Sequence, residues 1–173
     1  MAETTGQAPA RRSGPERTHQ HLITTWLAQA HPTPQTALQG WVKPGIVRLP
    51  CGWTFNAVRL RNELVHAAVG TSNTDTVNGA LAELVDGPVI HNRPGAEYHA
   101  LVPAPVPTVL WKHRDVAPML GIGQYLSVPA SDLTGPTGPH WAVRPHIAGN
   151  LCGLPFVTAL VSLGRGALAA RRP

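Results

Sequence analysis

The sequence predicts an α+β fold in a single domain. The chain has 173 residues, 43% of them apolar, which is enough to bury one core without disulfide bonds. Its 17 glycines and 18 prolines interrupt almost every stretch, which excludes a coiled coil or a bundle of long helices. The helical and extended stretches that remain come in separate runs. Such an order is typical of α+β proteins, and here it predicts a mixed sheet with flanking helices.

Apolar residues at helical spacing indicate a first helix over residues 18–30. Leu22, Ile23, Trp26 and Leu27 form its apolar stripe. Three further helices, each bounded by a capping or helix-breaking residue, are expected at 63–69, 76–85 and 155–170. Residues 32–40 are interpreted as a loop, because a proline follows the first helix at once.

Two strands, 46–49 and 55–60, flank the turn at 50–53, and we expect them to pair as a hairpin. In the second strand Arg59 and Arg61 alternate with apolar residues. These two arginines should therefore face outward.

A second hairpin is expected from residues 89–90 and 98–102, on either side of a turn at 92–95. The alternate prolines at 103–107 exclude an inner strand there and favour an extended, exposed segment. Two more strands are expected at 124–128 and 141–143.

The termini differ from the body in composition. Residues 1–17 are small and polar and predict a disordered tail, while residues 165–173 predict a basic tail with three arginines. The domain would then span 18–164. The formal net charge is +5, and most of this excess lies in the C-terminal segment.

The sequence contains no linear pattern for catalysis. The nine acidic residues include no pair at alternate positions of a strand, which a two-metal site would favour. The nine histidines include no HExxH pattern, and no phosphate-binding or dinucleotide-binding glycine motif is present. The catalytic residues therefore stay unknown, and neither a metal site nor a cofactor is predicted.

Cys51 and Cys152 lie about a hundred residues apart and form no CxxC pattern. Both are interpreted as reduced structural thiols, with any redox role left open. The longest apolar stretch, 154–163, is too short to cross a bilayer, and residues 1–17 lack the apolar core of a signal peptide. We therefore expect a cytoplasmic protein without a membrane partner.

Two of the five tryptophans lie near cations in the sequence. Trp53 is close to Arg48, and Trp111 precedes Lys112 and Arg114. An aromatic ring beside a cation is typical of single-strand and nucleobase binding. Filling of the core is the simpler interpretation, and it is the one adopted for each tryptophan.

Several segments, taken in order, resemble short actinobacterial proteins described as bifunctional DNA primase/polymerase (prim-pol) N-terminal-domain proteins. These segments are LPCGWTFNAVRL at 49–60, GPVI at 87–90, YHALVP at 98–103, Trp111, LGIGQYLSVP at 120–129 and HWAVRP at 140–145. The resemblance implies an α+β fold related to the primase core. Active members of that superfamily bind nucleotides and template with a carboxylate-held metal pair. The sequence departs from them at Asn56, where the family often has Asp, and in lacking the paired acidic motif.

Three functions follow as hypotheses. The first is a primase/polymerase-like domain without competent catalysis that binds nucleic acid or nucleotide in a DNA-linked or regulatory role. Its phosphate contacts would be Arg48, Arg59, Arg61, Lys112, Arg114 and Arg144. The second is a protein-interaction module, with a partner or a second copy bound at 103–107. The third is a metal-dependent nucleotidyl transferase, which would need Mg²⁺ or Mn²⁺ and carboxylates that converge only in three dimensions.

Overall fold

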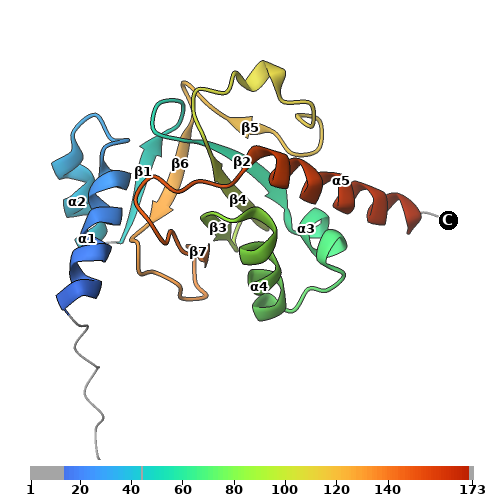
Figure 1. The fold of residues 1–173 in the computed structure, drawn as a ribbon, viewed down its shortest axis with the longest axis horizontal. Coiled ribbons are helices and arrows are strands. Elements are labelled where there is room, and N and C mark those ends of the chain that lie inside the picture. Colours follow the sequence, from blue (N-terminus) through green and yellow to red (C-terminus); the bar gives the residue numbers. More distant parts are fainter. Residues whose placement is uncertain (1–13, 44, 172–173) are drawn as a thin grey trace, which may run out of the picture.

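A five-stranded sheet forms the centre of the computed structural model, which describes residues 14–43 and 45–171 (Figure 1). The strand order is β5-β2-β4-β3-β7, and every pairing is antiparallel. Its strands are β2 (Asn56–Arg61), β3 (Val89–Asn92), β4 (Glu97–Val102), β5 (Met119–Leu120) and β7 (Pro139–Val143). A separate two-stranded sheet pairs β1 (Ile46–Pro50) with β6 (Tyr125–Pro129).

Five α-helices surround these strands in the described part of the chain. They are α1 (Gly14–Ala28), α2 (Pro34–Val42), α3 (Asn62–Val69), α4 (Thr74–Val85) and α5 (Leu154–Ala170). A short 3-10 helix, η1 (Thr108–Leu110), precedes β5. These elements confirm the α+β class.

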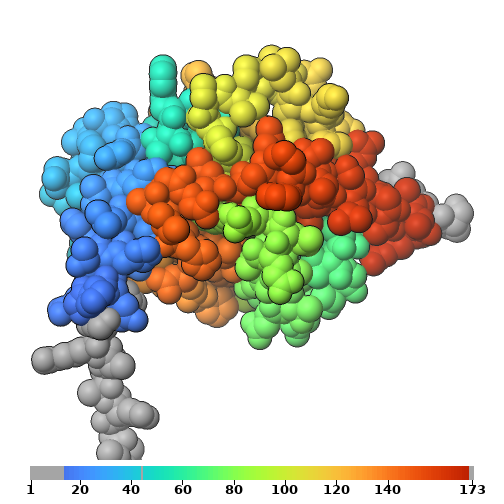
Figure 2. Space-filling view, in the orientation of Figure 1, coloured from blue at the N-terminus to red at the C-terminus, as the bar shows by residue number. Residues whose placement is uncertain are grey.

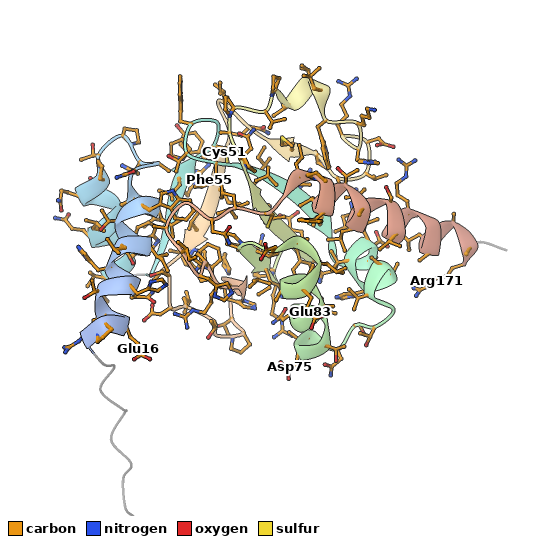
Figure 3. The ribbon with its side chains drawn as sticks, viewed as in Figure 1. Glu16, Cys51, Phe55, Asp75, Glu83 and Arg171 are labelled. Atoms are coloured by element: carbon orange, nitrogen blue, oxygen red, sulfur yellow. The ribbon has the colours of Figure 1, made fainter. Side chains whose placement is uncertain are left out.

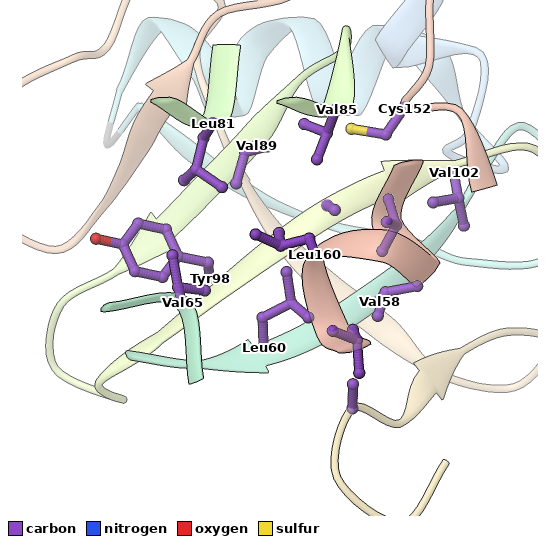
Figure 4. Close-up of a cluster of buried hydrophobic side chains, with 14 of the residues drawn as sticks. Val58, Leu60, Val65, Leu81, Val85, Val89, Tyr98, Val102, Cys152 and Leu160 are labelled. Atoms are coloured by element: carbon purple, nitrogen blue, oxygen red, sulfur yellow. The ribbon is translucent and has the colours of Figure 1, made fainter. Parts of the chain in front are cut away.

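Each face of the central sheet carries its own hydrophobic core. Val58 and Leu60 of β2 pack with Tyr98 of β4 beneath α3, α4 and α5 (Figure 4). The alternate residues Ala57 and Leu101 point to the other face, where they meet α1, α2, β1 and β6. Successive residues of a strand point to opposite faces of the sheet, so the same strands contribute side chains to both cores. The two cores therefore share one sheet and belong to a single domain.

The second face is covered over only part of its length. Along β2 its residues change from fully buried Ala57 to exposed Arg59 and Arg61. Helices α1 and α2 and the small sheet lie at one end of the molecule, whereas α3 and α5 lie at the other (Figures 1 and 2). The C-terminal end of β2 therefore emerges beyond the cover, and Arg59 and Arg61 face outward as expected.

Local sequence signals explain several helix ends. Gly70 ends α3 at a φ of 82°, a left-handed conformation that favours glycine. The Asn73 side chain accepts a hydrogen bond from the backbone N–H of Thr76 and so caps α4. The hairpin of β3 and β4 is confirmed, with Arg93 to Ala96 as its turn.

Two of the expectations for the N-terminal half are wrong. Residues 34–42 form helix α2 rather than a loop, because Pro34 occupies the first helical turn and Ala37 and Trp41 are buried. Strands β1 and β2 do not pair as a hairpin. Instead β1 pairs with β6, with Leu49 opposite Leu126, while β2 lies between β4 and β5.

The helices reach into both segments that were expected to be tails. Helix α1 begins at Gly14, within the segment 1–17, and residues 1–13 lie outside the described part of the chain. Helix α5 continues to Ala170, so Arg165 belongs to a packed helix. None of the described helices is long and apolar enough to span a membrane.

Both cysteines are buried and free. Burial raises the pKa of Cys51 to about 11 and that of Cys152 to about 12, so both remain protonated near neutral pH. Cys152 belongs to the core beneath α3, α4 and α5, and Cys51 belongs to the core on the other face of the sheet. This agrees with the expected structural role.

Candidate anion-binding groove

A groove of about 770 Å³ opens where β2 ends. The residues that line it come from β2, α3, the β3–β4 turn and the segment before β5: Arg59, Arg61, Asn62, Glu63, Gly95, Ala96, Glu97, Arg114, Asp115, Val116 and Pro118. A second hollow of about 580 Å³ shares Arg61, Glu63, Asp115 and Val116 with it and extends along α5 to Arg165 and Arg171. We call these adjoining hollows the arginine groove, after Arg59, Arg61, Arg114, Arg165 and Arg171.

The strand geometry explains why two of these arginines share one side. Arg59 and Arg61 are two residues apart on β2 and so point to the same face. Opposite them on β4 lie His99 and Glu97, respectively. The groove is thus built on the uncovered end of the second sheet face.

Helix α5 brings the other cations to the same place. Gly164 of α5 packs so closely on α3 that a Cβ atom there would lie 2.5 Å from the carbonyl oxygen of Leu64. This approach places Arg165 beside Asp115, with 3.9 Å between Nη1 and Oδ2. Arg171 lies at the far end of α5, away from Cys51 and Phe55 (Figure 3).

Three carboxylates partly neutralise the groove. Arg59 Nε lies 3.8 Å from Glu97 Oε2, and Arg61 Nη1 lies 3.9 Å from Glu63 Oε1. Together with the pair at Asp115, these ion pairs are long, and their side chains are solvent-exposed except that of Glu97, which is 21% exposed. Such pairs contribute about 0–1 kcal/mol to stability, so an incoming anion could replace the carboxylates at little cost.

Among the described residues, Arg114 and Arg171 differ from these three arginines. Within the described residues, no carboxylate lies at ion-pair distance from either guanidinium. Counting the five arginines and the three carboxylates, the arginine groove carries a net formal charge of +2. Guanidinium groups suit bidentate binding of phosphate, so the groove offers favourable chemistry for an anion.

His99 lies beneath the groove and is neutral near neutral pH. Its Nε2 is 3.5 Å from Glu97 Oε1, and its side chain is buried. Burial lowers the pKa of His99 to about 4; the charge of Glu97 acts in the opposite direction and that of Arg59 in the same one. The positive charge of the groove therefore comes from arginines.

The structure brings together three of the six residues expected to contact phosphate: Arg59, Arg61 and Arg114. Lys112 is exposed two residues before Arg114 and does not line the groove. Arg48 belongs to the small sheet, where its guanidinium carbon lies 5.3 Å from the ring centre of Tyr125.

Arg144 lies in a different hollow, lined also by residues of α1. Its Nε donates to the carbonyl oxygen of Ser131 and its Nη2 to Oε1 of Gln20, at 3.3 and 3.1 Å. These bonds tie the end of β7 to α1. The structure thus gives Arg144 a positioning contact away from the groove.

Sequence reasoning missed Arg165 and Arg171 as members of the site, because they were assigned to a tail. It also missed the carboxylates Glu63, Glu97 and Asp115. The two helix arginines lie six residues apart, a spacing without a recognisable motif. Only the packing of α5 on α3 brings them to β2.

The metal pair of a nucleotidyl transferase would need several carboxylates in one place. Among the described residues, no group of three or more His, Cys, Asp or Glu side chains could hold a metal ion. The three carboxylates of the groove each face an arginine instead. We therefore derive no catalytic step through Mg²⁺ or Mn²⁺.

Comparison of the chain with protein-family models, curated proteins and solved structures gives no match. The geometry and charge of the arginine groove are therefore the features that point to a function.

Proposed function

We propose that this protein is a nucleic-acid- or nucleotide-binding domain, primase/polymerase-like in sequence, that holds phosphate groups in the arginine groove without catalysing their transfer. The observation that carries the proposal is the convergence of five arginines from β2, α5 and the segment before β5. The role would be DNA-linked or regulatory, in the cytoplasm.

Two features of the groove support binding of a polyanion. Its arginines extend along two adjoining hollows, so they could contact several phosphates rather than one. The N-terminus of α3 also borders the groove through Asn62 and Glu63, and the positive end of a helix dipole favours anions.

Matched double variants test the proposal. We expect R59A/R61A to weaken binding of a labelled single- or double-stranded oligonucleotide roughly tenfold or more at physiological salt. The control R17A/K43A removes two exposed cations from α1 and from the end of α2, at the opposite end of the molecule, and should leave the affinity nearly unchanged. Both variants change the net charge equally, so a non-specific effect of charge would appear in both.

Substitution is preferable to truncation here. A deletion from residue 165 onward would remove the last turns of α5, including Leu168, which packs against the core. Equal affinity of R59A/R61A and the wild type for every oligonucleotide and for a nucleoside triphosphate would refute the assignment of the groove.

A further inference from the structure

A cluster of exposed apolar side chains lies at the other end of β2, in the part of the molecule that holds the β1–β2 loop and η1. Five large side chains form this cluster, which we call the aromatic edge: Trp53, Val109, Leu110, Ile122 and Tyr125. Trp53 is 79% exposed, a larger fraction than that of Tyr125, the other aromatic residue of the edge. This exposure contradicts the expectation that Trp53 fills the core.

Three chain segments meet at the aromatic edge. Gly52 packs against Ile122, since a Cβ atom on Gly52 would lie 2.5 Å from the Ile122 side chain. Gly121 is equally close to Thr108 at the start of η1. The backbone N–H of Cys51 donates to the carbonyl oxygen of Gln124 at 2.9 Å, which fixes the Trp53 loop beside the loop before β6. In Figures 1 and 2 the β1–β2 loop and the η1 segment project at the top of the molecule.

The segments that supply the edge carry cations and no acidic residue. These segments, residues 46–56, 107–112 and 120–129, contain no Asp or Glu, and Asp115 is the first acidic residue after η1. They include Arg48, which lies over the Tyr125 ring, and Lys112 next to η1. A second copy of the chain would bring the same cations face to face, whereas a polyanion with apolar faces would complement both features.

We propose that the aromatic edge binds the bases of single-stranded nucleic acid, with Trp53 as the stacking surface. Every base has an apolar π face, so stacking on an exposed indole ring needs no particular base sequence. Arg48 and Lys112 would contact the phosphates of the stacked nucleotides. In duplex DNA the bases stack on each other, so the edge selects single strands.

The proposal builds on the proposed function, because it names the form of nucleic acid that the protein takes. The segment from η1 to Pro118 connects the two sites: it supplies Val109 and Leu110 to the edge and Arg114 to the groove. A single strand could therefore place its bases on the edge and its phosphates in the arginine groove.

Two fluorescein-labelled probes separate base stacking from phosphate binding. One is an oligothymidylate of about 12 nucleotides, and the other is an abasic strand with the same number of phosphates. The wild type should bind the oligothymidylate roughly tenfold more tightly, since stacking of one or two bases is involved. Trp53→Leu should abolish this preference and leave the affinity for the abasic strand unchanged, whereas Trp53→Phe should keep most of it.

The leucine variant keeps an apolar side chain at an exposed position, so it should fold like the wild type. Equal affinity of the wild-type protein for the two strands would overturn the proposal that bases stack on the aromatic edge. A preference for oligothymidylate that survives in Trp53→Leu would overturn it as well. If the abasic strand still binds in that case, the proposal that the arginine groove binds phosphates is retained. If neither strand binds, the proposed function fails as well. A wild-type dimer that Trp53→Leu dissociates in sedimentation analysis would assign the edge to a second copy instead.

Discussion

The imidazole ring of His91 lies flat on the phenol ring of Tyr98, with 4.1 Å between the ring centres and 8° between the planes. His91 belongs to β3 and Tyr98 to β4, and they are directly opposite in the hairpin. Neither ring nitrogen of His91 has a hydrogen-bond partner among the described residues. The stacked pair therefore behaves as a piece of apolar core that contains a titratable group.

The first prediction concerns stability in acid. Burial, reinforced by the charges of His140, Arg93 and His66, lowers the pKa of His91 to about 4 from 6.5. The unfolded chain then binds more protons, so this contribution to stability is complete above pH 6.5 and is lost as the pH falls toward 4. This loss in the free energy of unfolding is on the order of 2 kcal/mol. His91→Phe should remove it, so denaturant titrations between pH 6.5 and 4 should show a smaller pH dependence than those of the wild type.

Exposed His21 supplies the control for this experiment. His21→Phe should leave the pH dependence as in the wild type. An acid transition that is the same in His91→Phe and the wild type would show that another group causes it.

The second prediction tests the close packing of α5 on α3. A Cβ atom at Gly164 would lie 2.5 Å from the Leu64 carbonyl oxygen and 2.8 Å from its Cδ1. Gly164→Ala should therefore lower the free energy of unfolding by about 1–3 kcal/mol. Gly166→Ala, in the same helix with no atom within 4 Å of the new Cβ, should raise it by up to about 1 kcal/mol. Equal effects of the two substitutions in urea unfolding would contradict this packing.

The third prediction concerns Asn56, the position where the resembling family often has Asp. The buried Asn56 amide donates from Nδ2 to the carbonyl oxygen of Val106 at 3.0 Å and so holds the 103–107 segment. A carboxylate cannot donate this bond, and its burial without a cation is costly.

Asn56→Asp should accordingly lower the melting temperature. The loss should be greater at pH 8 than at pH 5, because the buried acid would have a raised pKa and its protonated form can donate. The isosteric Asn62→Asp, at a half-buried position on the groove, is the comparison. A loss at position 56 that does not depend on pH would contradict the stated cause.

Much of the local structure follows from the sequence, because short-range signals determine it. The β3–β4 hairpin was predictable from two extended stretches around a four-residue turn, and the end of α3 from Gly70. Helix α2 was not predictable, because prolines on both sides of Thr33 are typical of a loop. Pro34 nevertheless occupies the first turn of the helix, where proline is tolerated. The partner of β1 was also unpredictable, because β6 follows some 75 residues later and no local pattern encodes that pairing.

In the candidate site, too, local features were predictable from the sequence and long-range contacts were not. Alternation along β2 was sufficient to predict that Arg59 and Arg61 face outward together. The contribution of Arg165 depends on how closely α5 approaches α3 at Gly164, a tertiary contact that periodicity does not reveal. Trp53 was assigned to the core because composition cannot tell a buried tryptophan from an exposed one.

The fourth prediction uses the carboxylate that faces Arg59. Glu97→Gln would remove a negative charge from the groove and release the Arg59 guanidinium, so the affinity for an oligonucleotide should rise several-fold. Glu83→Gln makes the same change of charge at an exposed position of α4 outside the groove, and it should have little effect. Equal gains in both variants would indicate a long-range effect of net charge rather than an effect at the groove.

The most direct test of the account is the salt dependence of oligonucleotide binding by the wild type, by R59A/R61A and by the charge-matched control R17A/K43A. Each phosphate contact that is lost reduces the slope of log affinity against log salt concentration by about 0.7 for a single strand. If the arginine groove is the binding site, R59A/R61A should have a slope shallower by about 1.4 and the control should match the wild type. Equal slopes for the three proteins, or the same reduction of the slope in both variants, would contradict binding at the groove.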